Sequence, residues 1–254
     1  MKTWMKWATA AAVVALLVVG GFLVWVNFIK EDAPERFTLE AAETEATEAT
    51  TTVPGTTTPD TLTATAAPAT DAETTTAPAA PATDGTWLVG TGSAVGYRVV
   101  EVLFGVDTEG VGRTDQVTGQ LTLAGTQVTD GSFEADLTTV VSDEDRRDNQ
   151  FRGRLMDTEN FPTATFTLTA PIELGAVPAD GTPVTTTASG ELTLRGTTNP
   201  VTVDVQAQKN GDTIQVVGST DIVFADYGIP RPEAPGITTQ DHGLLEFDLR
   251  LTQA

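Results

Sequence analysis

Hydrophobic and polar residues alternate in short runs along the chain from residue 85 to its end. In "VTGQLTL" the alternation places Val117, Leu121 and Leu123 on one face of an extended chain, because successive side chains of a β-strand point to opposite sides. Sequences such as "KNGD" and "PADGTP" separate the runs, and these residue types favour tight turns. The runs are residues 86–89, 96–103, 117–123, 131–140, 164–174, 189–196, 200–208, 212–224 and 243–252.

These runs predict about eight or nine short strands. No segment after residue 85 keeps a helical period over several turns. We therefore expect residues 85–254 to form one all-β, antiparallel domain, either a barrel or a sandwich.

A different pattern lies at the N-terminus, where residues 7–26 carry no charge and one polar side chain, Thr9. A helix of this length spans roughly 30 Å, the thickness of the hydrocarbon core of a bilayer. Lys2 and Lys6 precede the run, which favours a cytoplasmic N-terminus. A cleaved signal peptide is the alternative, although its apolar core is usually about 7–15 residues and ends at a small-residue cleavage site. We expect residues 1–30 to be a cytoplasmic tip and a transmembrane anchor helix, with the rest of the chain extracytoplasmic at the cell membrane.

The segment between anchor and domain is rich in threonine, alanine and proline, and has almost no large apolar side chain. Such a composition buries too little apolar surface to offset the entropy of ordering. We expect residues 31–84 to be a disordered stalk that spans roughly 40 Å as a flexible coil. Stalks of this kind are often O-glycosylated, and the sequence leaves this open.

Composition excludes several classes of function. The chain has 14 basic and 35 acidic residues and a formal net charge of −21, so we expect no nucleic-acid partner, because phosphate contacts need clustered Lys and Arg. It has no cysteine and one histidine, His242, which excludes thiol catalysis, disulfides and multi-histidine metal sites. We expect no metal, no cofactor and no catalytic residue.

The most charged stretch is residues 142–154, "SDEDRRDNQFRGR". It predicts a short helix that begins after Ser142 as N-cap and ends at Gly153, with acids in its first turn and arginines later. The spacing also predicts two ion pairs between residues four apart, Asp143–Arg147 and Asp148–Arg152.

Two functional interpretations of this stretch remain as alternatives to a structural role. A calcium loop needs alternating oxygen ligands, a central glycine and a late glutamate, which this stretch does not have. A pair of carboxylates acting as acid and base, as in a glycosidase, needs side chains that face one cleft, which neighbours on a capped helix rarely do. The sequence favours a structural role.

Two further motifs carry little weight. "GTGSAVG" at residues 90–96 has the wrong glycine spacing for a dinucleotide-binding loop and precedes a strand-like run. His242 stands just before the last predicted strand and fits a turn position, with a pH-sensitive or ligand contact as the alternative. There is no G-x-S-x-G motif.

Four motifs in order along the chain resemble a known family. They are "YRVVEVLF", "RRDNQFRGRLMDTENFPTATF", "GELTLRGTTNPVTVDV" and the closing "FADYGI…LLEFDLRL". Together they resemble the YceI-like, polyisoprenoid-binding lipid carriers, over about residues 86–252. The resemblance implies an eight-stranded, lipocalin-like antiparallel barrel with a short helical segment, whose apolar lumen holds an isoprenoid chain.

The resemblance also indicates which residues line the lumen. Two stretches differ from the short links expected in the family, "FGVDTEGVGRTDQ" and the proline-rich "DYGIPRPEAPGITTQDHG", and we expect both to be loops that shape the mouth. The candidate lumen residues are Tyr97, Val99, Phe133, Leu137, Phe151, Leu155, Phe166, Leu168, Phe224 and Tyr227.

Together these features predict a membrane-anchored, extracytoplasmic binding protein for an isoprenoid-type lipid, a polyprenyl chain or a quinone, and not an enzyme. One alternative is a displayed interaction or stress-response module whose barrel is filled by its own side chains. Another is a hydrolase of the cell envelope that uses carboxylates. The sequence leaves the oligomeric state and the identity of the lipid open.

Overall fold

The computed structural model describes residues 33–40, 83–103, 105–176, 178–234 and 237–254. The predicted anchor at residues 7–26 and most of the predicted stalk lie outside these ranges. Within them, the model contains no helix with both the length and the apolar character needed to cross a membrane.

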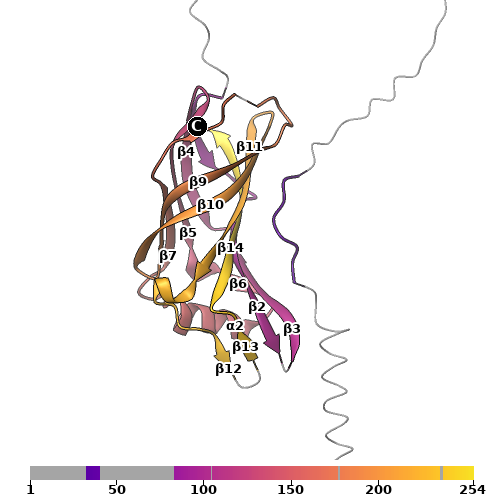
Figure 1. The fold of residues 1–254 in the computed structure, drawn as a ribbon, viewed down its shortest axis with the longest axis vertical. Helices are drawn as coiled ribbons and strands as arrows, with labels where there is room; N and C mark the ends of the chain where they lie inside the picture. Colours follow the sequence, from indigo (N-terminus) through magenta and orange to yellow (C-terminus); the bar gives the residue numbers. More distant parts are fainter. Residues whose placement is uncertain (1–32, 41–82, 104, 177, 235–236) are drawn as a thin grey trace, which may run out of the picture.

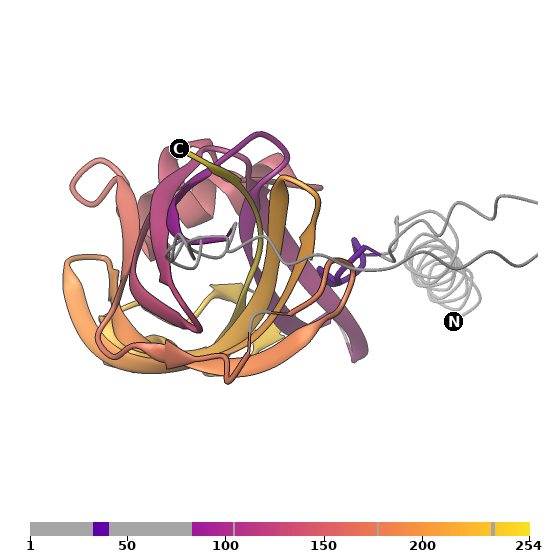
Figure 2. The same ribbon diagram turned by 90° about the horizontal axis from the view of Figure 1, so that it is seen from above.

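The domain is an all-β, eight-stranded antiparallel barrel, as the family resemblance implies (Figures 1 and 2). The strands pair in the order β1-β4-β5-β7-β9-β10-β11-β14, and β14 pairs back with β1 to close the ring. Closure leaves no free edge in this ring. The bounds are β1 Gly85–Val89, β4 Val117–Ala124, β5 Gln127–Asp136, β7 Thr163–Leu168, β9 Val184–Leu194, β10 Thr197–Asn210, β11 Thr213–Val223 and β14 His242–Gln253.

Two further strands, β2 (Ala94–Leu103) and β3 (Val106–Thr114), extend the wall from β14. The first half of β14 pairs with β2, and β2 pairs with β3. The expectation that "FGVDTEGVGRTDQ" is a loop is therefore wrong, because β3 lies within it. Other small strands are β6 Val141–Ser142, β8 Ile172–Glu173, β12 Glu233–Ala234 and β13 Ile237–Thr239.

The two ends of the barrel differ. At one end, which we call the hairpin end, tight turns at Gly125 and Gly211 join neighbouring strands. At the other, the helix end, the helix α2 (Asp145–Gln150) and the π-helical turn η3 (Phe151–Leu155) lie across the opening (Figure 1). The second expected loop, after Tyr227, also lies at the helix end and contains β12 and β13.

The core consists of the side chains that point inward at alternate positions along the strands. At the hairpin end Trp87 and Leu251 are 1% and 0% exposed and pack with Leu121, Leu123 and Ile214. Full burial of one such side chain stabilises the fold by about 1.5–3 kcal/mol. The core at the helix end consists of Leu137, Val140, Phe151, Met156, Ala164, Leu192, Leu194, Ile222 and Tyr227.

The charged stretch before η3 is helical, as predicted, and its ends differ from the prediction. The N-cap is Glu144, which makes no side-chain cap hydrogen bond. Ser142 instead ends β6 and donates its backbone N–H and its hydroxyl to Asp148 Oδ1, over 2.9 and 2.6 Å. Asp148 is 5% exposed. These two hydrogen bonds connect β6 to α2, and Asp148 does not form the predicted ion pair with Arg152.

The arginines of this stretch also hold the helix to the barrel. Arg147 pairs with Asp143, as predicted, and with Glu101 of β2 at 3.6 Å. Arg152 donates to the carbonyl of Val140 at 3.0 Å. Gly153 does not end the helix, because the π-helical turn continues to Leu155. The stretch therefore has the structural role that the sequence favoured.

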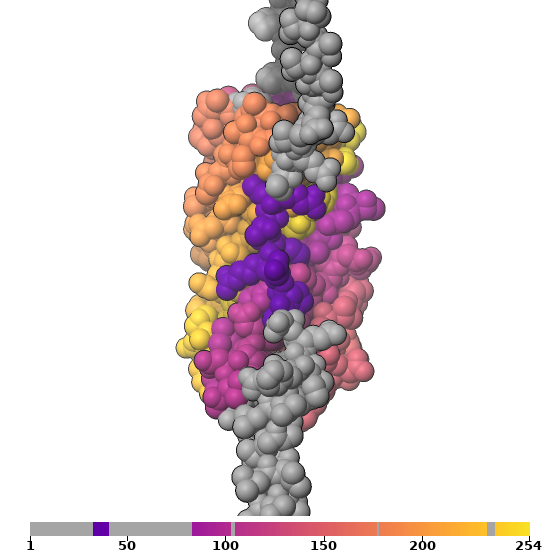
Figure 3. All heavy atoms as spheres, turned by 90° about the vertical axis from the view of Figure 1, so that its right-hand side faces the viewer, coloured from indigo at the N-terminus to yellow at the C-terminus, as the bar shows by residue number. Residues whose placement is uncertain are grey.

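Residues 33–40 are extended and lie along the outer wall of the barrel (Figure 3). We call this segment the strap. The sequence placed it in a disordered stalk, but hydrogen bonds connect it to β2, β3, β11 and β14. Its composition gave little sign of this, since the contacts use mainly its backbone.

Candidate functional site

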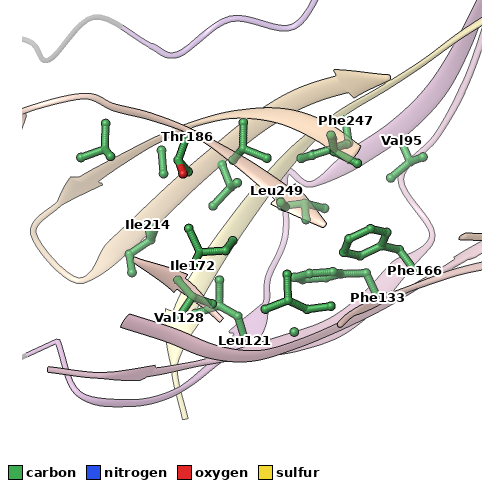
Figure 4. Close-up of a pocket in the computed structure, with 18 of the residues that line it drawn as sticks. Val95, Leu121, Val128, Phe133, Phe166, Ile172, Thr186, Ile214, Phe247 and Leu249 are labelled. Atoms are coloured by element: carbon green, nitrogen blue, oxygen red, sulfur yellow. The ribbon is translucent and has the colours of Figure 1, made fainter. Parts of the chain in front are cut away.

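A cavity of about 200 Å³ occupies the half of the barrel nearer the hairpin end (Figure 4). Seven strands of the ring, β4, β5, β7, β9, β10, β11 and β14, contribute side chains to its wall. We call it the hairpin-end cavity. Its lining is dominated by aliphatic and aromatic groups, among them Leu121, Val128, Phe133, Phe166, Val203, Ile214, Phe247 and Leu249.

Three aromatic rings of this wall lie against glycines of neighbouring strands. A Cβ at Gly218 would stand 2.5 Å from Phe247 Cζ, and one at Gly190 would stand 2.3 Å from Phe166 Cζ. Phe133 covers Gly119 in the same way, at 2.8 Å from its Cδ1. A ring can lie this close to a neighbouring strand only where that strand carries no side chain. The glycines thus let the rings lie along the wall rather than across the lumen.

Polar groups gather where the cavity meets the hairpin end. Lys209, near the end of β10, belongs to its lining. Lys209 Nζ lies 2.7 Å from Asp180 Oδ1, and this hydrogen bond lowers the pKa of Asp180 below its usual range. An apolar interior with a few polar groups at its mouth is typical of sites that bind a chain with a small polar head.

A second cavity of about 130 Å³ lies at the helix end, and we call it the helix-end cavity. Tyr97 and Phe151 stack in its wall with ring centroids 5.0 Å apart. Burial raises the pKa of the Tyr97 phenol well above its usual value, so the ring stays neutral. Val95, Ala164 and Leu245 line both cavities, which therefore lie next to each other inside the barrel.

The structure distributes the candidate lumen residues over this interior. Phe133, Phe166 and Leu168 line the hairpin-end cavity. Tyr227 lines neither cavity and is buried in the core of the helix end. Those that line the helix-end cavity are Tyr97, Val99, Leu137, Phe151, Leu155 and Phe224.

Most of the hairpin-end wall is absent from that candidate set. Val203 and Val205 of β10, Ile214 of β11, and Phe247 and Leu249 of β14 all line the cavity. The alternation of "PVTVDVQAQ" and "GLLEFDLRLT" had already placed four of them on an inward face. The signal was present, but alternation marks core and cavity wall alike.

The charged groups outside the lumen make structural contacts in the part of the chain that the structure describes. Among the residues that the structure describes, no group of three or more His, Asp or Glu side chains could hold a metal ion. His242 is half-exposed, and its Nδ1 lies 2.9 Å from Asp241 Oδ1. Asp148 is held by Ser142. The lumen can bind an apolar guest by excluding water from it.

Comparison with known proteins agrees with this architecture. A family model for the YceI-like domain matches residues 88–251. The chain is similar in structure to a polyisoprenoid binding domain from Saccharophagus degradans implicated in plant cell wall breakdown. The two share 22% identity with a TM-score of 0.54, over 67% of this chain and 99% of that one.

Two further solved structures are less similar. BcnA from Burkholderia cenocepacia shares 22% identity at a TM-score of 0.48, over 62% of this chain and 95% of its own. The YceI protein of Campylobacter jejuni shares 13% identity at a TM-score of 0.43, over 56% and 84%. No curated protein matches the chain.

Proposed function

This chain belongs to the YceI-like domain family, and we propose that its barrel holds an isoprenoid-type lipid, a polyprenyl chain or a quinone, in its lumen. The observation that carries the proposal is the apolar hairpin-end cavity inside a closed barrel. A structural module with a completely filled barrel would have no such space. On this proposal the protein is a binding protein and not an enzyme.

The lumen suits a hydrocarbon chain on energetic grounds. Each methylene group moved from water into an apolar interior contributes about 0.8 kcal/mol, so a five-carbon isoprene unit contributes up to roughly 4 kcal/mol. Few polar contacts are then needed, and the head group remains near Lys209 at the mouth.

The size of the lumen limits the length of the buried chain. The hairpin-end cavity, at about 200 Å³, exceeds the ~150 Å³ engineered cavity that admits benzene, so on the order of two isoprene units fit in it. The helix-end cavity adds about 130 Å³ next to it. Affinity should therefore rise with chain length over the first few isoprene units and then level off.

The same proposal includes the membrane. Residues 1–30 form a cytoplasmic tip and a membrane anchor, residues 31–84 connect it to the domain, and residues 85–254 are the extracytoplasmic barrel. The apolar run at residues 7–26 and the lysines before it support this arrangement. Membrane association that resists alkaline carbonate, with the barrel accessible to protease only from the outer side, is the expected result.

The binding proposal is tested by narrowing the lumen. Ala207 lines the hairpin-end cavity, and its neighbour Gln206 is exposed on the outer face of the same strand. Delipidated protein should take up one fluorescent farnesyl analogue per chain. Ala207→Trp should weaken uptake at least tenfold, whereas Gln206→Trp should leave it unchanged. A correctly folded wild-type protein that takes up no analogue would refute the proposal and favour the filled-barrel alternative.

A further inference from the structure

The strap is held largely through its backbone. Arg98 Nη2 donates to the carbonyl of Pro34 at 2.6 Å, and Arg113 donates to the carbonyl of Glu35. The guanidinium of Arg113 also stands 4.0 Å from the centre of the Phe37 ring, a favourable cation–π distance. The first half of the strap is thus fixed by two arginines of β2 and β3.

The second half is fixed by β11 and β14. The Gln215 side chain accepts the backbone N–H of Glu40 at 2.9 Å and donates to the carbonyl of Thr38 at 3.3 Å. The carboxylate of Glu40 meets Arg250 through two contacts, of 2.7 and 3.0 Å. A paired contact of this kind fixes geometry better than a single charge contact does.

The wall beneath the strap is unusual for the outside of a barrel, because its charged groups are buried. Arg98 is 4% exposed and Glu246 is 2% exposed. Glu246 lies 2.8 Å from Arg113 and 3.5 Å from Arg98. Buried charges are costly unless they are paired and hydrogen-bonded. The carbonyls of Pro34 and Glu35 each accept a hydrogen bond from one guanidinium group, those of Arg98 and Arg113, so the strap supplies part of the hydrogen bonding of this wall.

The strap has a defined direction along the barrel. The carbonyl of Pro34 accepts a hydrogen bond from the Arg98 side chain. In the β2–β14 ladder Arg98 lies opposite Leu244, near the start of β14. Its Glu40 meets Arg250, near the other end of that strand. Leu244 lines the helix-end cavity, and the last residues of β14 lie beside the turn at Gly211. Residue 33 therefore lies toward the helix end and residue 40 toward the hairpin end. Figures 1 and 3 show the strap running along the side of the barrel between its two ends.

We infer that the strap fixes the orientation of the barrel on the membrane, with the helix end toward the bilayer and the hairpin end away from it. The inference rests on the proposed function, because it takes residues 7–26 as the anchor. The chain from Val26 to residue 33 reaches at most about 25 Å. Without the strap, the tether from residue 27 to residue 84 would be a coil of roughly 40 Å that imposes no orientation.

This orientation assigns different roles to the two cavities. The helix-end cavity, with Tyr97 and Phe151 in its wall, lies next to the bilayer. The hairpin-end mouth, with Lys209, faces the extracytoplasmic space. In this arrangement the strap, and not the chain between the strap and β1, sets the distance between barrel and membrane.

The test uses single-cysteine labels in the full-length chain, which has no cysteine of its own. Val141, 60% exposed, marks the helix end, and the exposed Asp212 marks the hairpin end. A strand of about ten residues spans on the order of 35 Å, and the long strands of the ring separate the two ends of the barrel by about this distance. The Val141→Cys and Asp212→Cys proteins are each labelled with a donor dye and reconstituted into vesicles of phosphatidylcholine and phosphatidylglycerol. The vesicles contain a lipid with a rhodamine head group, which is the acceptor of energy transfer.

Energy transfer to the lipid should be at least threefold more efficient from position 141 than from position 212. The strap variant Phe37→Ala/Glu40→Ala loses the contact of the Phe37 ring with Arg113 and that of the Glu40 carboxylate with Arg250, and it should reduce this difference. The control Glu35→Ala/Arg36→Ala changes exposed side chains of the same segment and should preserve it. Equal transfer from both positions in the wild-type protein, an unchanged difference in the strap variant, or no membrane association of the full chain would each overturn the inference.

Uptake of the farnesyl analogue, measured on the same preparations, separates this inference from the binding proposal. The strap variant should keep wild-type uptake, because the strap touches only the outer wall. Loss of uptake in every protein, with the labels still oriented, would refute the binding proposal and leave the orientation standing.

Discussion

At the scale of single residues, glycines on the wall determine where the aromatic side chains can lie. Gly112 of β3 faces Tyr97 across the β2–β3 pair, and a Cβ there would stand 2.5 Å from Tyr97 Cε1 and 2.9 Å from its hydroxyl oxygen. The three atoms nearest to such a Cβ all belong to the Tyr97 side chain. The ring alone would have to move, and it is stacked on Phe151 at the helix end of the lumen.

Gly112→Ala should therefore destabilise the barrel by about 1–3 kcal/mol through overpacking. The cost should fall in a Tyr97→Leu background, because the conflicting ring is gone and the two changes are coupled. Urea unfolding of the two single variants and the double variant measures this. A cost that is the same in both backgrounds would show that the ring is not what Gly112 accommodates.

A structural role and a hydrolytic role for the charged stretch predict different effects of a substitution at Asp148. Its carboxylate accepts the backbone N–H and hydroxyl of Ser142 while almost fully buried. Asp148→Ala removes the acceptor of the Ser142 N–H and leaves the hydroxyl only the longer contact to the carbonyl of Glu144, at 3.3 Å, so it should lower the free energy of unfolding by about 2 kcal/mol. Asp145→Ala, at an exposed position of the same helix, should change it little. Wild-type stability in Asp148→Ala would contradict the structural role.

At the scale of elements, the sequence predicted strands wherever apolar residues alternate. It missed β3, whose stretch "VDTEGVGRT" contains two glycines. Glycine is depleted in strands, but Gly110 and Gly112 are needed here because Arg147 and Tyr97 lie against them. The helix at residues 145–155 was predicted, but its ends were not, since Ser142 bonds to Asp148 rather than to a free N–H of the first turn. Such contacts depend on tertiary neighbours that a local pattern does not reveal.

The strap, as an element, should respond to pH through Glu40. The hydrogen bond and the charge of Arg250 lower the pKa of Glu40 below its usual 4.5. A lowered folded-state pKa means that this contact stabilises the bound strap above about pH 4.5 and is lost as the pH falls through the lower value. When Glu40 is protonated, the Arg250 guanidinium still has the carboxylate of Asp248 as an ion-pair partner, 3.4 Å away.

Hydrogen exchange of the strap amides measures this effect. Glu40→Gln removes the charge and provides the reference. The wild-type strap should be better protected than the Glu40→Gln strap at pH 7, and the two should become equal as the pH falls below 4. A difference that grows as the pH falls would contradict the assigned contact.

At the scale of the whole molecule, the family motifs predicted the closed barrel, and the structure adds the shape of its interior. Nine of the ten candidate lumen residues line one of two adjacent cavities, and Tyr227 does not. The sequence could not separate cavity wall from solid core, because both need inward apolar side chains. The strap was also beyond prediction, since its site exists only after β2, β3, β11 and β14 have come together.

The central claim is that an isoprenoid chain lies inside the barrel, and photo-crosslinking tests it most directly. A farnesyl or geranylgeranyl probe with a diazirine at its chain end is bound to the delipidated full-length protein, irradiated, and mapped by peptide mass spectrometry. The account predicts crosslinks at inward residues of β10, β11 and β14, such as Val203, Ile214 and Leu249, which unlabelled polyprenol suppresses. Crosslinks confined to outward residues of the same strands, such as Gln206, or none that polyprenol suppresses, would contradict it.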